Sequence, residues 1–290
     1  MKALITGCYG QLGNCLRLVL DKDPEIEAVY TDYDTLDITD RDAVNRFISD
    51  NKFDVVVNCA AYTAVDKAES DGIKAALLNT EAIGHLGEAA LKNGTKVIHI
   101  STDYVFSGEN FRPYDENDEP LPQGIYGRTK FEGEALLSSF CQDAIIIRTA
   151  WLYSEFGKNF VKTMLSLAET RPELNVVCDQ IGSPTYAGDL AEAIHAIIRS
   201  EKWVPGVFHF TDEGVTSWYD FSKAIFEIAG KEMKINAVPT SAYPTPAKRP
   251  LYSVLSKEKI KSTYGISIPY WRDSLRKCIA ILNANEKTAE

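Results

Sequence analysis

Tyr126 and Lys130 are the two residues whose types and spacing point most directly to chemistry. They lie four residues apart in the segment QGIYGRTKFEGE, residues 123–134. This spacing places both side chains on one face of a helix. A free phenol has a pKa of about 10, and a nearby ammonium lowers that pKa because it favours the phenolate. The pair therefore predicts an acid–base group. The alternative is a partly exposed pair on a surface helix.

A second polar group follows the apolar run 96–102, which we predict to be a strand. Ser101, Thr102 and Asp103 lie where this run ends. Open α/β sheets bind their ligands at the carboxyl ends of the strands, so we expect this to be the active edge. The Thr102 hydroxyl is suited to hydrogen-bond a substrate carbonyl and hold it near the Tyr126 hydroxyl.

Three glycines form a turn near the start of the chain. Gly7, Gly10 and Gly13 lie between a predicted strand at 2–6 and a predicted helix at 11–20. Glycines there permit a tight turn and let backbone N–H groups approach a pyrophosphate, which the helix N-terminus then faces. In this context the pattern predicts a dinucleotide-binding turn. The alternative is a helix-entry turn without a ligand.

Asp32 ends the next predicted strand, 27–32, and lies 19 residues after Gly13. The dinucleotide fingerprint has an acid about 20 residues on, which accepts a hydrogen bond from a ribose 2′-OH. No Arg or Lys occurs between residues 23 and 40, so nothing nearby would offset the 2′-phosphate of NADPH. The cofactor is therefore NADH or NADPH, with NADH preferred. Other acids follow and leave the choice of Asp32 open, namely Asp34, Asp37 and Asp40.

Two further segments are predicted to line the cofactor. Asp37 and Ile38 follow the second strand and are placed to flank the adenine. The segment CAAYT, residues 59–63, follows the third strand, and its small residues let a cofactor lie close to the backbone.

Short apolar runs alternate with amphipathic segments along the first half of the chain. Strands that are apolar throughout and alternate with helices predict a parallel sheet covered on both faces. The fold class is therefore α/β, a Rossmann-type doubly wound parallel sheet with a smaller C-terminal substrate-binding domain. We expect strands at 2–6, 27–32, 53–60, 96–102 and 144–149, and helices at 11–20, 39–50 (capped by Thr39), roughly 70–92 and from about Tyr126.

The chain divides into two predicted domains. Residues 1–150 form the NAD(P)-binding domain, and residues 151–290 mainly bind substrate, with a strand near 205–211 as a candidate to return to the first domain. The proline-rich stretch 236–250 cannot be regular structure. We expect it to be an ordered loop that forms a ligand wall, and a linker is the alternative.

Composition excludes several classes of function. The chain has 290 residues, a net charge of −10 and a pI near 5.0, which disfavours nucleic acid and anionic membranes as partners. No apolar run is long enough to span a membrane, and the N-terminus runs straight into a strand without a signal peptide. The six cysteines form no CxxC pair and the four histidines no zinc motif. We therefore expect a cytoplasmic protein without a metal site.

Seven longer segments of the sequence resemble one protein family. They are TAVDKAES, STDYVFSG, YGRTKFEGE, RTAWLY, KNFVKTML, DQIGSPT and AVPTSAYPTPAKRP, and they cover most of the chain. Together with the glycine turn, they resemble the dTDP-4-dehydrorhamnose reductase family, in the extended branch of the short-chain dehydrogenase/reductase superfamily. The resemblance implies NAD(P)H-dependent reduction of the 4-keto group of dTDP-4-dehydro-L-rhamnose to give dTDP-L-rhamnose for surface polysaccharide.

The resemblance also implies a role for individual residues. Tyr126 would donate the proton, while Lys130 would hold the nicotinamide ribose and tune Tyr126. Thr102 and Asp103 would contact the sugar, and Trp151 would line its pocket, although an ordinary core tryptophan is the alternative. The remaining implied contacts are Gly10, Gln11 and Leu12 for the cofactor phosphates; Ala61, Tyr62 and Thr63 for the cofactor wall; and Asn159, Lys248 and Arg249 for the substrate phosphates. The segment VDKAES, 65–70, receives no role beyond an acidic helix cap.

The sequence departs from the family pattern in two respects. Cys8 and Tyr9 occupy the glycine turn where a small hydroxyl residue is usual, so Tyr9 is expected to pack over the cofactor or narrow its site. Some family members form dimers bridged by Mg²⁺ through acids on two helices. Here those positions hold Cys15 and the Gly188–Asp189 pair, which argues against the metal bridge, although a homodimer of another kind is compatible with the sequence.

Two other functions remain open on the same residues. One is a related nucleotide-sugar reductase that acts on a different 4-keto hexose, since changes in the pocket alone redirect substrate choice. The other is a non-catalytic, dinucleotide-binding regulatory subunit.

Overall fold

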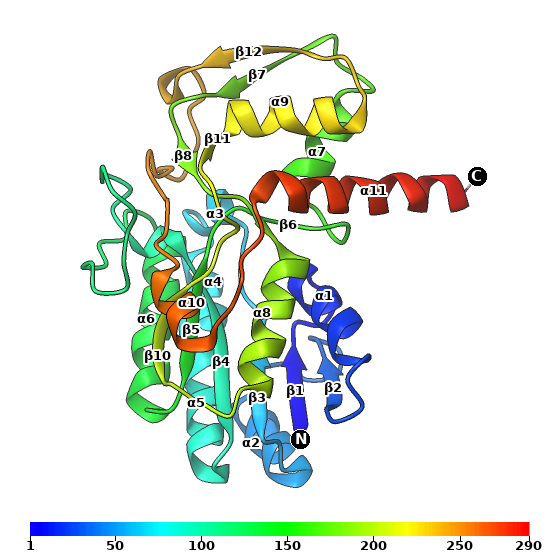
Figure 1. The fold of residues 1–290 in the computed structure, drawn as a ribbon. Helices are drawn as coiled ribbons and strands as arrows, with labels where there is room; N and C mark the ends of the chain where they lie inside the picture. Colours follow the sequence, from blue (N-terminus) through cyan, green and yellow to red (C-terminus); the bar gives the residue numbers. More distant parts are fainter. Residues whose placement is uncertain (290) are drawn as a thin grey trace.

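The main sheet has six parallel strands in the order β10-β5-β4-β3-β1-β2. It is seen in a computed structural model that describes residues 1–289, with side chains through residue 285. From β1 the chain steps one way to β2 and the other way to β3, so the topological switch point lies at the ends of β1 and β3 (Figure 1). This confirms the doubly wound fold class. The strands are β1 (Lys2–Thr6), β2 (Glu27–Thr31), β3 (Val55–Asn58), β4 (Lys96–Thr102), β5 (Ile145–Thr149) and β10 (Gly206–His209).

Helices cover both faces of this sheet. On one face α1 (Gln11–Leu20) and α8 (Ala187–Arg199) share a core in which Leu16 and Ile194 are fully buried. On the other face α2 (Arg41–Asn51), α5 (Ala82–Asn93) and α6 (Ile125–Phe140) bury Ile48, Leu86 and Leu137. The strand β5 is buried along its whole length. Strands buried on both faces explain why the sequence shows continuous apolar runs without alternation.

The helix boundaries differ from the predicted ones at two places. Asp40, and not Thr39, caps α2, since its carboxylate accepts a hydrogen bond from the backbone N–H of Ala43 at 2.9 Å. The Thr39 hydroxyl instead donates to Asp37. The helix expected at 70–92 is divided into α4 (Gly72–Ala76), a π-helical turn η1 (Leu77–Glu81) and α5.

A smaller part with its own core lies above the carboxyl ends of the strands (Figure 1). Phe221, Trp271 and Leu275 are among its buried residues. Three elements after residue 150 belong to the sheet and its covering helices instead. β10 pairs with β5, α8 packs on α1, and α10 (Glu258–Tyr264) contacts β10. The smaller part is built from β6 (Leu152–Tyr153), α7 (Phe160–Leu167), β7 (Glu173–Val177), β8 (Ile181–Gly182), β9 (Thr185–Tyr186), β11 (Thr216–Ser217), α9 (Trp218–Ala229), β12 (Lys234–Val238) and α11 (Trp271–Ala289).

The proline-rich stretch is not entirely loop, so that prediction was wrong at its start. Residues 236–238 belong to β12, which pairs in parallel with β7, and a short 3-10 turn η3 (Thr240–Ala242) follows. The prolines begin only at Pro239, where the strand ends, which is why the ladder can form before them. The rest of the stretch runs back toward the sheet, and α10 (Glu258–Tyr264) covers the edge near β10.

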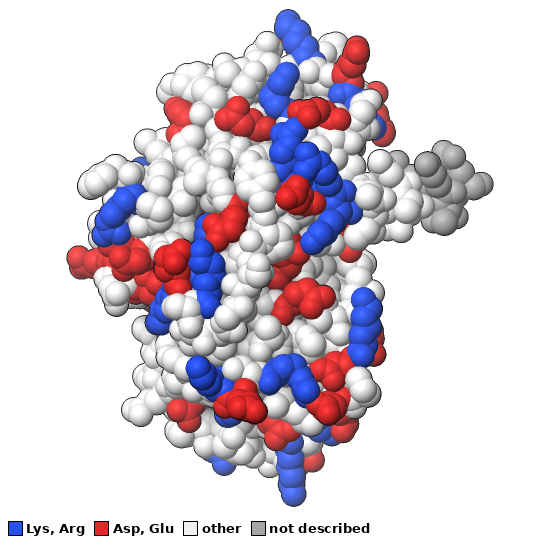
Figure 2. Space-filling model, in the orientation of Figure 1, with Lys and Arg blue, Asp and Glu red and all other residues white. Residues whose placement is uncertain are grey.

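The surface carries both signs of charge. Lys and Arg are interspersed with Asp and Glu on the face shown in Figure 2, and no single sign dominates it. Among residues 1–289, no helix is both long and apolar enough to cross a membrane.

Candidate active site

A cavity of about 860 Å³ opens at the carboxyl ends of β1 to β5. It collects residues from the glycine turn, the ends of four further strands and the first turns of α6. Most of the predicted site residues line it, namely Gly7, Gly10, Gln11, Leu12, Gly13, Asp32, Asp37, Ile38, Ala61, Thr63, Thr102, Asp103, Tyr126, Lys130 and Trp151. The structure thus brings together predicted residues that lie up to 144 positions apart in the sequence, from Gly7 to Trp151.

The glycine turn is shaped by close backbone approach. A Cβ on Gly13 would lie 2.4 Å from the Gly7 carbonyl oxygen, and a Cβ on Gly7 would lie 2.6 Å from the Ala60 nitrogen. Gly7 also has a φ of +66°, which favours glycine. These contacts leave no space for side chains between β1, α1 and β3. The start of α1 is therefore held against the ends of two strands, as a pyrophosphate site requires.

Asp32 is fixed by two backbone amides at the end of β2. Its Oδ2 accepts from the N–H of Tyr9 and its Oδ1 from that of Tyr33, both at 2.9 Å. The carboxylate is therefore held at the mouth of the glycine turn, within the cavity. Tyr9 and Tyr33 also line the cavity and are largely exposed. The position of Tyr9 in the glycine turn predicted that it lies at the cofactor site, whereas no signal in the sequence singled out Tyr33.

Lys130 is buried beneath the cavity floor. Its ammonium donates to the Ile100 carbonyl at 2.7 Å and lies 3.3 Å from Nε2 of His99. Burial lowers the pKa of Lys130 to about 8, and the nearby Glu134 carboxylate opposes this shift. The contact with His99 was not foreseen, because a strand histidine carries no distinctive sequence signal.

Tyr126 lies one helical turn before Lys130 on α6, as predicted. Burial raises the pKa of Tyr126, while the neighbouring Thr102 hydroxyl opposes the rise. The expectation that Lys130 lowers this pKa is therefore not met in the chain by itself. The ammonium is directed at Ile100, and burial dominates. The phenol keeps its proton at neutral pH, the state that a proton donor needs.

Asp103 is a buried carboxyl beside the phenol. Its Oδ1 accepts from the Thr102 hydroxyl at 2.9 Å, and burial raises the pKa of Asp103 to about 6. Hydrogen bonds from Thr102 and Ser253 oppose that rise. A carboxyl with this pKa, at a cavity wall, is suited to contact sugar hydroxyls as acceptor or donor.

A buried ion pair anchors α6 to the sheet. Arg148 on β5 donates to Glu134 on α6, with its Nη2 2.6 Å from Oε2, and each side chain is 4% exposed. The hydroxyl of Ser101 on β4 donates to the same carboxylate. The sequence contains Glu134 at the end of the QGIYGRTKFEGE segment, but pairing across 14 residues cannot be read from one sequence.

Aromatic rings form the opposite wall. Trp151 stacks face to face on Trp218, with ring centroids 3.5 Å apart, and Phe160 packs on Trp218 at 4.5 Å. All three line the cavity. Trp151 adopts a positive φ of 49°, which is uncommon for a residue other than glycine. Trp218 and Phe160 come from α9 and α7 in the smaller part, and sequence reasoning missed both.

Four of the predicted residues lie outside the cavity lining. Tyr62 is held by Asn79 of the π turn, whose Oδ1 accepts from the Tyr62 N–H at 2.8 Å. Asn159 caps α7 and donates to Gln11 Oε1 at 2.9 Å. The remaining two are cations in ion pairs, Lys248 with Glu109 at 2.9 Å and Arg249 with Asp66 at 2.5 Å.

The positions expected to matter for a metal bridge do not form an oxygen site. Cys15 is 2% exposed and packs in the core, and Asp189 accepts a hydrogen bond from Ser274 with Lys277 at 3.5 Å. Within the described part of the chain, no group of three or more His, Cys, Asp or Glu side chains is placed to hold a metal ion. A buried thiol and a carboxylate engaged by Ser274 and Lys277 are poor partners for Mg²⁺, which prefers oxygen ligands, so the absence of a metal bridge stays a prediction.

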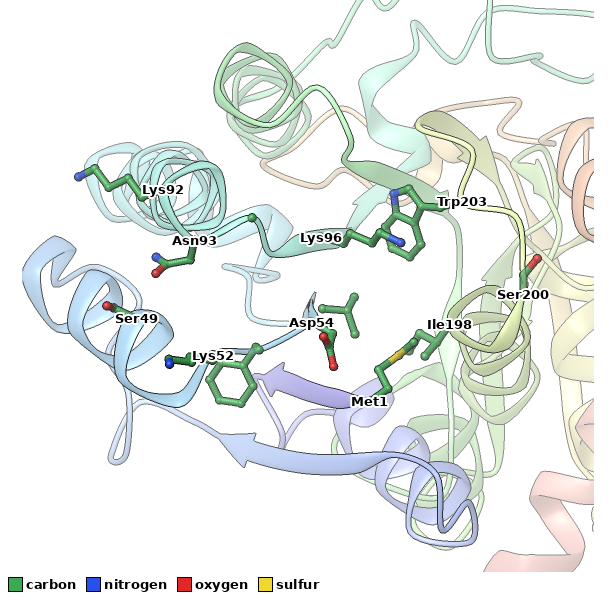
Figure 3. A pocket seen from close by; sticks show the side chains of 13 residues that line it. Met1, Ser49, Lys52, Asp54, Lys92, Asn93, Lys96, Ile198, Ser200 and Trp203 are labelled. Carbon is green, nitrogen blue, oxygen red and sulfur yellow. The ribbon is translucent and has the colours of Figure 1, made fainter.

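A second cavity of about 840 Å³ lies at the amino-terminal ends of the strands (Figure 3). Lys96 lies over the ring of Trp203 at 4.7 Å there, and Met1 and Asp54 also line it. It is bordered by the C-terminal ends of α2, α5 and α8. Lys52 and Lys92 lie at the ends of the first two, where they offset the negative ends of the helix dipoles. None of the catalytic candidates reaches this cavity.

Comparisons with known proteins agree with this geometry. A family model described as the RmlD substrate binding domain matches residues 1–284. A dTDP-4-dehydrorhamnose reductase from Aggregatibacter actinomycetemcomitans is 43% identical over 285 residues, which are 95% of this chain and 97% of that protein.

Solved structures give the same result. The crystal structure of a dTDP-4-dehydrorhamnose reductase from Clostridium acetobutylicum is 44% identical, with a TM-score of 0.94 over 98% of this chain and 100% of that one. The dTDP-4-dehydrorhamnose reductase from Bacillus anthracis, in complex with NADP, is 35% identical, with a TM-score of 0.92 over 96% and 98%.

A glycine turn that faces a Tyr–Lys pair across the edge of a parallel sheet defines an oxidoreductase of the extended short-chain dehydrogenase/reductase type. Within that class the chain belongs to the dTDP-4-dehydrorhamnose reductase family.

Proposed function

We propose that this chain reduces the 4-keto group of dTDP-4-dehydro-L-rhamnose and releases dTDP-L-rhamnose. The observation that carries the proposal is the single cavity in which Tyr126, Lys130 and Thr102 face the glycine turn, in a member of this family. The reaction adds a hydride to the carbonyl carbon and a proton to its oxygen. A nicotinamide cofactor supplies the hydride when it is bound, and Tyr126 supplies the proton.

The neighbouring residues prepare Tyr126 for this step. Thr102 is placed beside the phenol. Its hydroxyl can therefore donate a hydrogen bond to the substrate carbonyl and hold that carbonyl within reach of the Tyr126 proton. Lys130 places positive charge beneath the floor, one helical turn from Tyr126, and is placed to hold the nicotinamide ribose. Asp103 and the Trp151 ring provide a polar and an apolar wall for the sugar.

The cofactor residues fit a dinucleotide. Gly7, Gly10 and Gly13 would hold the pyrophosphate at the start of α1, and Asp32 would accept from the adenosine ribose. We propose that NADH is preferred. Arg41, the first cation after the acidic stretch, is held by both oxygens of Glu88 at 2.7 Å and points to α5 rather than to a 2′-phosphate. With Asp37 also at the wall, the extra charge of NADPH would meet carboxylates.

Turnover is the direct test. The purified chain is mixed with NADH or NADPH and with a panel of nucleotide-activated 4-keto sugars that includes dTDP-4-dehydro-L-rhamnose. We expect the cofactor to be oxidised with that sugar and the product to be the 4-hydroxy sugar. Turnover only with another sugar would assign the related reductase function. Cofactor binding without turnover on any sugar would assign a regulatory subunit.

A further inference from the structure

The helix that carries Tyr126 begins without a cap of its own. Its N-cap residue is Gly124, which has no side chain to accept from the first N–H groups of α6. The Ile125 N–H is instead bound by Oε1 of Glu69 at 2.9 Å, from a residue 56 positions earlier in the chain. Glu69 thus supplies from outside the acceptor that Ser, Thr, Asp or Asn supplies at most helix starts.

Glu69 and Gly124 fit one another closely. A Cβ at position 124 would lie 2.7 Å from the Glu69 carboxylate oxygen, so the absence of a side chain there lets the carboxylate reach the helix end. The negative charge also lies at the positive end of the α6 dipole, which adds to the stabilisation.

The segment that presents Glu69 is itself fixed. It follows the short helix α3 (Val65–Ala68), in which Ala68 is fully buried against Tyr62 and Ala75. Ile125 and Tyr126 pack on the same cluster. The start of α6 is therefore held by packing and by the Glu69 hydrogen bond together.

Asp66, a second acid of the same segment, supports Tyr126 from the side of Tyr104. Asp66 accepts from Nη2 of Arg249 at 2.5 Å, and Nη1 of Arg249 donates to the Tyr104 hydroxyl at 3.0 Å. The Tyr104 ring meets the ring of Tyr126 edge to face, with centroids 5.4 Å apart. Tyr126 is therefore braced from both sides by residues that depend on VDKAES, the segment to which sequence reasoning gave no role.

We propose that Glu69 is a positioning residue for the reaction, acting through the first turn of α6 to fix the Tyr126 hydroxyl at the cavity. This rests on the proposed role of Tyr126 as proton donor. Glu69 does not line the cavity, so it acts on the geometry of the donor and not on the binding of substrate or cofactor. A proton donor displaced by a fraction of an ångström loses rate in the chemical step.

Amide hydrogen exchange tests the capping contact without substrate. In Glu69→Ala, the peptide that spans residues 125–130 is expected to exchange about tenfold faster than in the wild type, as the loss of one helix cap predicts. Glu69→Gln keeps an acceptor oxygen, so its exchange should stay within about threefold of the wild type. Unchanged exchange in Glu69→Ala would overturn the proposal.

Steady-state kinetics test the positioning. Glu69→Ala is expected to lower kcat roughly tenfold, with the KM values for sugar and cofactor changed less than about twofold, and Glu69→Gln should restore most of kcat. Glu258→Ala is the matched control, because it removes a carboxylate from the first turn of α10, none of whose residues lines the cavity. An equal loss in Glu258→Ala, a loss confined to KM, or no rescue by glutamine would contradict the positioning role.

The two measurements separate this proposal from the proposed function. If the wild type fails to turn over any 4-keto sugar while Glu69→Ala still exchanges faster, then the proposed function fails and the capping contact stands. If the wild type turns over and Glu69→Ala is unchanged in both measurements, then the proposed function stands and the positioning role fails.

Discussion

Tyr126 combines burial with a cavity-facing position, and this combination decides its chemistry. Burial favours its neutral form, so the phenol holds a proton until charge develops on a neighbouring oxygen. Lys130 lies one turn away and keeps positive charge beneath the floor, although its own pKa is lowered to about 8. The spacing in the sequence predicted that the two residues share a helix face. It did not predict that the Lys130 ammonium bonds to Ile100, because the depth of burial depends on the whole sheet.

Replacement of Tyr126 by Phe keeps the ring and removes the transferable proton. We expect kcat to fall by roughly 10²–10⁴, the range for general acid–base groups, while cofactor affinity stays close to that of the wild type. The measurement is steady-state kinetics together with a cofactor titration of the same variant. A variant with nearly normal kcat would assign the proton to another group.

Asp32 and the acids after it are expected to set cofactor preference. One unfavourable charge contact near the surface is enough for about 1.4 kcal/mol, so we expect kcat/KM to be roughly tenfold higher with NADH than with NADPH. The two values are compared at saturating sugar and moderate salt. Equal values, or a preference for NADPH, would mean that a cation such as Arg46, in the hollow beside Tyr33 and Asp37, reaches the 2′-phosphate.

At the scale of elements, hydrophobic periodicity predicted most of the sheet and its helices. The observed bounds of β1, α1 and β4 match the predicted ranges, because each element is a continuous apolar run or an amphipathic stripe bounded by polar residues. The prediction failed where a choice depends on distant partners. Asp40 competes with Thr39 for the cap of α2, and the π turn at 77–81 forms around Asn79, whose partner is the backbone of Tyr62.

The same distinction applies to the candidate site. Residues at strand ends and in the glycine turn could be predicted, because the topology of a parallel sheet brings those positions to one edge. Residues contributed by the smaller part, such as Trp218 and Phe160, could not be predicted, because their position depends on how that part packs over the sheet.

Gly13→Ala tests the glycine turn as an element. The new Cβ would lie 2.4 Å from the Gly7 carbonyl oxygen and 2.6 Å from Cys8 Cα, so backbone atoms must move. We expect a loss of about 1–3 kcal/mol in stability, as for overpacking. Cofactor binding should weaken by about tenfold or more. Thermal unfolding and cofactor titration give the two values. Gly72→Ala is the control, since its Cβ would make only an ordinary contact at 3.5 Å. An equal effect in that variant would show that the glycine turn has no specific role in cofactor binding.

At the scale of the whole molecule, the cavity lies between the sheet, which holds the cofactor residues and Tyr126, and the smaller part, which closes one wall with aromatic rings. The hydrogen bond from Asn159 to Gln11 links α7 directly to the glycine turn. The two parts therefore meet at the site.

Removal of divalent metal tests whether a metal ion bridges a dimer of this chain. Because Cys15 and Asp189 do not form an oxygen site, we expect a chelator to change neither the turnover rate nor the molecular mass in solution. Light scattering after size-exclusion chromatography, with and without EDTA, measures the mass. A dimer that dissociates in EDTA would show that a metal bridge forms through other residues.

Transfer of the hydride from the cofactor to the sugar can be followed with deuterium. The chain is incubated with dTDP-4-dehydro-L-rhamnose and with NADH that carries deuterium at the transferable position, and the sugar product is examined by NMR. We expect one deuterium per product molecule, bound at C4 of dTDP-L-rhamnose, with formation slowed by Tyr126→Phe. Oxidation of the cofactor without deuterium at C4, or no product from this sugar, would contradict this expectation.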